Sequence, residues 1–317
     1  MLTTFAAQAS LDCPPRLSDM SAPTRVLVTG ATGFVGSRVV PALIEAGYEV
    51  RAMTRHPDDY RGPADPVGAD VGRPETLGPA LAEVDVAVYL VHSLDDKDFE
   101  RKDREAARAF GGAAAAAGVR QIVYLGGLGS DDGDLSPHLR SRREVESLLG
   151  EAGVPVTVLR AAIVVGDGGI SWEITRQLVK NLPAMVVPRW ASTRTQPIAL
   201  EDVVRYLVGV VDNAAAVDRV FEIGGPEPMT YLEMLRIASE VMTGEPVPIL
   251  EVPVMTPRLS SYWLSLVTDI DVTTGRNLID SMGTEVVVTD DSIREVVPFE
   301  PMEYDEAVRR ALEERGR

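Results

Sequence analysis

The stretch Arg25-Val26-Leu27-Val28-Thr29 runs directly into Gly30-Ala31-Thr32-Gly33-Phe34-Val35-Gly36. Residues 25–29 are apolar enough to form a buried strand, and residues 34–46 have the spacing of an amphipathic helix. Between them, Gly30 permits a tight turn, Gly33 lets a ligand approach the backbone, and Gly36 lets the helix pack closely on the strand. The stretch therefore predicts a strand, a glycine-rich turn and a helix, in that order.

A turn of this kind is a candidate site for phosphate groups. The N-terminus of the following helix offers free N–H groups and the positive end of the helix dipole. A glycine pattern alone is weak evidence, but this one joins an apolar strand to a helix at the start of a βαβ series. We predict that the pyrophosphate of a dinucleotide binds here, at Gly30, Thr32, Gly33, Phe34, Val35 and Gly36.

Apolar runs alternate with helical patterns along the first half of the chain. Further strands are expected at 49–53, 67–70, 85–91, 121–125 and 156–159, and further helices at 98–117 and 139–149. This alternation predicts a parallel sheet with helices wound on both faces. The pattern loosens after Arg160, where we expect helices at 171–181, 201–212, 231–242, 257–267 and 302–314 and strands at 220–223 and 247–252.

These elements predict an α/β fold: a Rossmann doubly wound parallel sheet with a smaller C-terminal α/β substrate lobe. Residues 1–23 are expected to be a disordered leader, or the result of a start codon assigned too early, because Met20 stands just before the first strand. Residues 24–165 would form the NAD(P)-binding core. Residues 166–317 would form mainly the substrate lobe, with segments near 196–223 returning to the core.

Composition excludes several classes of partner. A net charge of -17 argues against nucleic acid, and no apolar run approaches the length of a membrane span. One Cys and three His argue against a disulfide framework and against a metal centre. Only three residues are lysines, and an acidic, lysine-poor surface suits a high-salt cytoplasm. We expect a cytoplasmic protein with a small-molecule substrate and no metal; the sequence does not indicate its oligomeric state.

The spacing of the glycines carries a specific resemblance. Thr29 to Gly36 resembles the atypical and extended short-chain dehydrogenases, including the nitrogen-regulator (NmrA-like) branch. A subgroup known only as NAD(P)-binding proteins is similar at 89–93, 139–142, 182–185 and 188–190. The resemblance covers nearly the whole chain after Thr24. It implies the fold more firmly than the activity, since one fold carries many functions.

The end of the second strand bears on the choice between NADP and NAD. An NAD site usually ends this strand with an acid that bonds the ribose 2′-hydroxyl, but residues 50–56 contain none. Arg55 is instead placed to pair with a 2′-phosphate, unless it is a solvated loop residue. We predict that NADP(H) is preferred over NAD(H). Asp70 resembles the family's adenine-contacting acid, and it could equally be a turn residue.

The catalytic residues of the family are missing. The resemblance implies a Ser after the fifth strand and a Tyr-x-x-x-Lys on the next helix, where a tyrosinate relays a proton. Here the Ser position reads Gly, and by register His138 and Arg142 stand at the Tyr and Lys positions. Either His138 acts as acid or base, with Arg142 on the ribose and His92 as a second proton donor, or both histidines are structural.

The remaining candidate residues follow the strand ends and the second half of the chain. The family's cofactor-lining segments imply further contacts at Val91, Gly126, Gly127, Ala162 and Ile163. Candidate substrate residues are Trp190, Gln196, Tyr262 and Trp263. Aromatic residues are more often plain core, but adjacent Tyr262 and Trp263 cannot share one helix face. A ligand here would be apolar, such as a prenyl, quinone or aromatic carbonyl compound.

Two functions therefore remain open. The first is an atypical short-chain oxidoreductase in which NADP(H) serves hydride transfer to a small, apolar carbonyl or C=C substrate. The second is a non-catalytic NADP(H)-binding redox sensor or assembly protein. The missing Ser, Tyr and Lys favour the second, whereas the cleft-lining segments and the aromatic lobe favour the first. A sugar-nucleotide epimerase is disfavoured, because its chemistry depends on the same missing Tyr.

Overall fold

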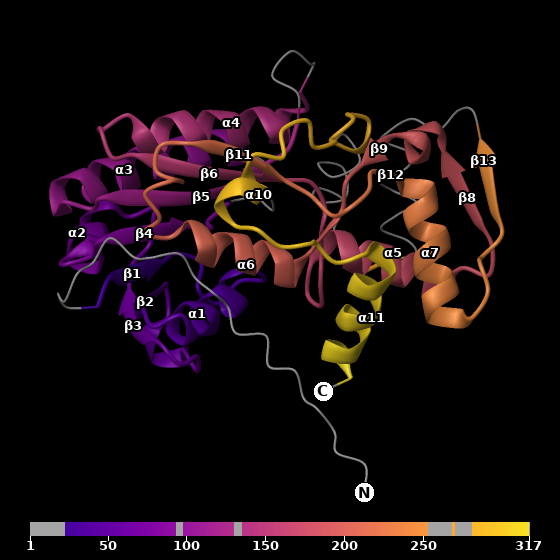
Figure 1. Ribbon diagram of the computed structural model, residues 1–317, viewed down its shortest axis with the longest axis horizontal. Coiled ribbons are helices and arrows are strands. Elements are labelled where there is room, and N and C mark those ends of the chain that lie inside the picture. Colours follow the sequence, from indigo (N-terminus) through magenta and orange to yellow (C-terminus); the bar gives the residue numbers. More distant parts are fainter. Residues whose placement is uncertain (1–22, 93–97, 130–134, 253–267, 270–280, 317) are drawn as a thin grey trace, which may run out of the picture.

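A seven-stranded parallel sheet forms the centre of the molecule (Figure 1). The computed structural model describes residues 23–92, 98–129, 135–252, 268–269 and 281–316. The strands lie in the order β11-β6-β5-β4-β1-β2-β3, and all their pairings are parallel. The chain runs from β1 to one edge and then crosses back to β4. This reversal opens a crevice at the carboxyl ends of β1 and β4. The predicted α/β Rossmann fold is confirmed.

The strands lie close to the apolar runs that predicted them. The predicted strand at 67–70 begins two residues earlier and ends at Gly68. Since β1 and β4 are buried on both faces, the apolar runs predicted them well. The strands of the sheet are β1 (Arg25–Val28), β2 (Glu49–Thr54), β3 (Asp65–Gly68), β4 (Val86–Tyr89), β5 (Gln121–Gly127), β6 (Val156–Ala161) and β11 (Val220–Ile223).

Helices cover both faces of the sheet. One face carries α1 (Gly36–Glu45), α6 (Leu200–Val210) and α10 (Ile293–Val296), whose apolar side chains form one core with the strands. The other face carries α2 (Leu77–Leu81), α3 (Phe99–Ala117) and α4 (Pro137–Gly150) over a second core. Helix α2 was not predicted, because five residues are too few to show a helical period.

A smaller lobe lies beside the carboxyl ends of the strands (Figure 1). Its core surrounds the buried Trp172 and is built from α5 (Ile170–Asn181), α7 (Tyr231–Thr243) and α11 (Tyr304–Arg315). Short strands pair within it: β8 (Met185–Pro188) with β13 (Ile249–Val252), β7 (Val164–Val165) with β10 (Ile198–Ala199), and β9 (Arg194–Thr195) with β12 (Met229–Thr230). Three 3-10 turns complete the described elements: η1 (Pro57–Asp59), η2 (Pro74–Thr76) and η3 (Arg189–Ser192).

Two elements from the second half of the chain pack on the central sheet. Strand β11 pairs with β6, and α6 packs against α1. The division of the chain near residue 165 stays a prediction. The helix predicted at 257–267 and residues 1–22 of the predicted leader lie outside the described residues. Within the described part of the chain, every helix is too short or too polar to cross a bilayer.

The contact between Gly36 and the turn before it yields a stability prediction. A Cβ atom at Gly36 would lie 2.2 Å from the Gly30 carbonyl oxygen and 2.9 Å from Ala31 Cα. Because backbone cannot move aside cheaply, we expect Gly36→Ala to lower the free energy of unfolding by about 2–3 kcal/mol. Urea denaturation measures this. The control is Gly112→Ala, an exposed α3 site with no atom within 4 Å. It should stabilise the protein by up to about 1 kcal/mol; equal effects would contradict the steric argument.

Candidate functional site

A cavity of about 1180 Å³ opens at the carboxyl ends of the central strands. It exceeds the roughly 300–1,000 Å³ usual for a small-molecule site, so it has room for a long ligand and a second molecule. The segments that line it follow β1 to β6 in turn. Every residue predicted to bind the dinucleotide lies on its wall: Gly30, Thr32, Gly33, Phe34, Val35, Gly36, Arg55, Asp70, Val91, Gly126, Gly127, Ala162 and Ile163.

The turn after β1 fits a pyrophosphate. Gly30 has a φ of +63°, which favours glycine, and its carbonyl accepts a hydrogen bond from the Gly33 N–H at 2.9 Å. No side chain caps the N-terminus of α1, so the first helical turn is left open to an anion. The Leu90 N–H donates to Thr29 Oγ1 at 2.9 Å and ties the end of β4 to the end of β1.

The ends of β2 and β3 form one end of the cavity. Arg55 is exposed at the rim, and its guanidinium makes no hydrogen bond or ion pair with the described residues. Its charge is therefore available to a phosphate. Asp70 also lines the cavity, but its Oδ1 accepts a hydrogen bond from the Gly72 N–H at 2.9 Å. Asp70 thus stabilises its own turn, and its contact with adenine stays a prediction.

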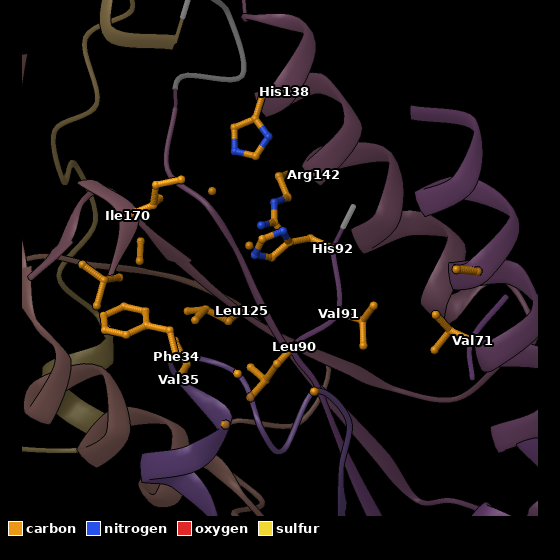
Figure 2. A pocket seen from close by; sticks show the side chains of 18 of the residues that line it. Phe34, Val35, Val71, Leu90, Val91, His92, Leu125, His138, Arg142 and Ile170 are labelled. Atoms are coloured by element: carbon orange, nitrogen blue, oxygen red, sulfur yellow. The ribbon is translucent and has the colours of Figure 1, made fainter. Parts of the chain in front are cut away.

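Three candidate catalytic side chains meet at the other end of the cavity. The Ser136 hydroxyl caps α4 by accepting from the Leu139 N–H at 3.3 Å. His138 lies in the first turn, and Arg142, four residues on, shares its helix face. His92 follows the end of β4. Figure 2 shows the Arg142 side chain between the two imidazole rings, and His138, Arg142 and His92 all line the cavity.

Both rings are held in the neutral form. Burial, followed by the positive charge of Arg142, lowers the pKa of His138 to about 3. His92 is an exposed residue of the cavity wall, and its ring lies beside Arg142 (Figure 2). Burial, Arg142 and His138 lower the pKa of His92 as well. Near neutral pH each ring can donate one N–H hydrogen bond, but neither carries the extra proton of an imidazolium acid.

A side chain at either of the two glycines that end β5 would contact neighbouring side chains. A Cβ atom at Gly127 would lie 2.8 Å from Leu139 Cδ2. At Gly126 it would lie 3.0 Å from Glu146 Oε1 and 3.1 Å from Tyr124 Cε1. Neighbouring side chains therefore fill the place of a serine side chain, and a serine would fit only after they shifted.

The predicted substrate residues do not gather at this end. The structure places Gln196 outside the cavity wall, where Nε2 donates to the Gly225 carbonyl at 2.7 Å and Oε1 accepts from the Val288 N–H at 3.0 Å. Both amide atoms therefore have a structural role, and the substrate role of Gln196 stays a prediction. Trp190 lies on η3, but its side chain is not described. Tyr262 and Trp263 lie outside the described residues.

Residues from both halves of the chain form this part of the wall. Buried Leu128, Leu139 and Val286 pack into a small apolar cluster, and the Ser281 hydroxyl lies 3.0 Å from the Ser136 hydroxyl at the start of α4. Sequence reasoning missed these positions because they belong to distant segments. The sequence offered one signal, the predicted starts of two helices, because α5 begins at Ile170 and α7 at Tyr231, which both line the cavity. The lining residues not predicted as substrate contacts include Leu128, Ile170, Tyr231, Ser281, Met282 and Val286.

Charge also distinguishes the cavity from the rest of the chain. Four cationic side chains and two carboxylates line it, whereas the chain as a whole carries -17. This local surplus of positive charge suits a ligand with several phosphates. The six charged lining residues are Arg55, Arg101, Lys102, Arg142, Asp70 and Glu105.

Comparison with known proteins supports a dinucleotide-binding role for the cavity. A family model described as NAD(P)H-binding matches residues 30–214, which is more than half of the chain. A (4-alkanoyl-5-oxo-2,5-dihydrofuran-3-yl)methyl phosphate reductase of Streptomyces griseus is 30% identical over 229 residues, covering 68% of this chain and 73% of that protein. The photosystem II assembly factor Ycf39 of Synechocystis is 24% identical, covering 74% of this chain and 72% of its own.

A solved structure shares the fold over nearly its whole length. The triphenylmethane reductase of Citrobacter, crystallised with NADP(H), superposes with a TM-score of 0.74 at 18% identity. The match covers 90% of this chain and 99% of that one. At this identity the likeness supports the fold alone.

The lowered pKa of His138 predicts a pH dependence of stability. Below its ordinary pKa of about 6.5, the unfolded chain takes up a proton at His138 that the folded chain excludes down to about pH 3. Stability is therefore lost as the pH falls through this window. We expect His138→Gln to reduce the loss between about pH 7.5 and 5 by up to about 2 kcal/mol. Urea denaturation at both pH values measures it. Equal losses in the variant and the wild type would show that His138 is not protected from protonation.

Proposed function

This chain belongs to the NAD(P)H-binding family, and on that premise we propose that it is an atypical short-chain oxidoreductase. It would use NADP(H) to reduce a small, apolar carbonyl or conjugated C=C compound. The observation that carries the proposal is one continuous cavity, which joins the phosphate-binding turn to an apolar wall beside His138 and Arg142. The 30% identical Streptomyces griseus protein, a reductase by name, supports the reaction class.

The preference for NADP(H) rests on the adenosine end of the cavity. Strand β2 ends in Thr54, and no acid follows it at the rim, where Arg55 stands without a partner among the described residues. A guanidinium recognises a phosphate by paired hydrogen bonds and charge, which a ribose hydroxyl cannot match. Arg55 would therefore hold the 2′-phosphate.

The residues at the other end would stabilise negative charge on the substrate. When bound, the cofactor supplies the hydride. The positively charged guanidinium of Arg142 would face the oxygen that gains charge during reduction. Neutral His138 would donate an N–H hydrogen bond to the same oxygen, and His92 would support it from the opposite side. The final proton would come from solvent, which suits a conjugated acceptor whose anion is delocalised.

A second candidate function is a non-catalytic NADP(H)-binding sensor or assembly protein. By the resemblance, a Gly stands where active members of the superfamily carry Ser, and His138 and Arg142 stand at the Tyr and Lys positions. The similarity to the assembly factor Ycf39 of Synechocystis favours the same candidate. Both candidates need the cofactor, but only the oxidoreductase needs an acceptor to reach it.

We further propose a cytoplasmic location and a cofactor-binding unit at residues 24–165.

Replacing Arg55 tests the cofactor preference. We expect Arg55→Glu to weaken NADPH binding by about 100-fold, because a carboxylate would repel the 2′-phosphate, while NADH binding changes little. Calorimetric titration with both cofactors measures the two dissociation constants. The matched control is Arg61→Glu, which makes the same charge change at an exposed residue outside the cavity wall. A preference that stays the same in Arg55→Glu would remove the residue from this role.

Turnover separates the two candidate functions. NADPH oxidation is followed by absorbance with a panel of quinones, conjugated ketones and saturated ketones. We expect kcat with conjugated acceptors to be nearly constant between about pH 5.5 and 8.5, because His138 does not titrate there. His138→Ala should lower kcat by about 10–100-fold, and His138→Gln by less, since it keeps an N–H donor. Tight NADPH binding without turnover on any acceptor would favour the second candidate.

A further inference from the structure

Arg142 carries a charge that no described carboxylate neutralises. Its one hydrogen bond to a described residue runs from Nη1 to the Tyr124 hydroxyl at 3.4 Å. Glu146 lies one turn further along α4, but its carboxylate pairs with Arg160 at 2.8 Å and with Arg143 at 3.6 Å. The guanidinium of Arg142 therefore lines the cavity without an ion-pair partner among the described residues, although the carboxylates of Glu146 and Asp103 lie near enough to act on Tyr124.

Three neighbours of Arg142, the rings of His138, His92 and Tyr124, are neutral. Burial and the charge of Arg142 keep His138 unprotonated near neutral pH, and the same influences act on His92. Burial keeps Tyr124 protonated by raising its pKa, although Arg142 opposes this. Arg142 is thus the one charged member of this group, and its side chain lies between the two imidazole rings (Figure 2).

The sheet topology indicates which half of a dinucleotide would lie beside this charge. In a doubly wound sheet each half of the dinucleotide occupies one half of the sheet. Arg55 and Asp70 stand on the side of β2 and β3, whereas His92, Gly127 and Ala162 follow β4, β5 and β6. With the adenosine half on the first side, the nicotinamide half falls on the side of Arg142.

The two redox forms of the cofactor differ in charge at that half. The reduced nicotinamide ring is neutral, and the oxidised ring carries one positive charge. Resting on the proposed cofactor function, we propose that Arg142 makes this site selective for the reduced form by repelling the cationic ring of the oxidised form. In an oxidoreductase this selectivity would speed release of the spent cofactor; in a sensor it would make occupancy follow the ratio of the two forms.

The size of the effect follows from Coulomb's law. Two unit charges about 8 Å apart, at the effective dielectric constant of about 20 that suits a protein surface, repel strongly enough to change a dissociation constant more than tenfold. The cavity is open to solvent, which screens part of this repulsion. We therefore expect the wild type to bind NADPH about tenfold more tightly than NADP⁺.

The experiment measures dissociation constants of the full-length protein for NADPH and NADP⁺ by calorimetry. Arg142→Met should bring their ratio to within about twofold of unity, and Arg142→Lys should keep it near tenfold because the charge remains. Arg142→Gln keeps a donor for Tyr124 but not the charge, so it should behave like Arg142→Met. The control Arg140→Met removes an equal charge from an exposed residue of α4 outside the cavity wall, and should keep the wild-type ratio.

The outcomes that would overturn the inference are distinct. Equal binding of both forms by the wild type, or an unchanged ratio in Arg142→Met and Arg142→Gln, would refute the role of Arg142 while leaving the proposed cofactor function intact. Loss of the ratio in Arg142→Lys would show that guanidinium geometry, not charge, is responsible. Binding of neither form by the wild type would refute the proposed cofactor function, and the inference with it.

Discussion

The architecture depends on how closely α1 approaches the turn after β1. Gly36 brings the helix so near that its missing Cβ would overlap the Gly30 carbonyl, and Gly30 in turn adopts a left-handed φ. This contact aims the uncapped end of α1 at the cavity. It also sets the packing of α1 against the sheet and α6. The close contact between Gly36 and the Gly30 carbonyl therefore positions both the predicted phosphate site and the helix packing on one face of the sheet.

The sequence predicts the central sheet well, for a physical reason. Strands β1 and β4 are buried on both faces, so they appear as unbroken apolar runs, and the helices around them are long enough to show their period. The prediction failed where that signal is absent. Helix α2 has five residues, and β8 forms only by pairing with β13, more than sixty residues further along the chain. Such pairings follow from tertiary contacts that no local pattern encodes.

The same contrast runs through the site. The residues proposed for the cofactor follow the ends of successive strands. Because the carboxyl ends of parallel strands lie at one edge of the sheet, these residues could be predicted to share one wall. The opposite wall draws on α5, α7 and the segment around Ser281, whose meeting depends on packing of the lobe. Gln196 illustrates the difference, since its amide bonds two backbone segments that only the fold brings together. His138 and Arg142 were found by register, but their electrostatic coupling required the fold.

The charge surplus of the cavity has a kinetic consequence. An anionic ligand approaching a chain of net charge -17 first meets repulsion, and attraction to Arg55 and its cationic neighbours acts only at short range. Salt shortens the reach of both, with a Debye length of about 10 Å at 0.1 M, but the long-range barrier is weakened first. The association rate constant of an anionic ligand should therefore be higher at high salt concentration than in dilute buffer. The acidic surface thus makes the rate of ligand binding to the cavity depend on salt concentration.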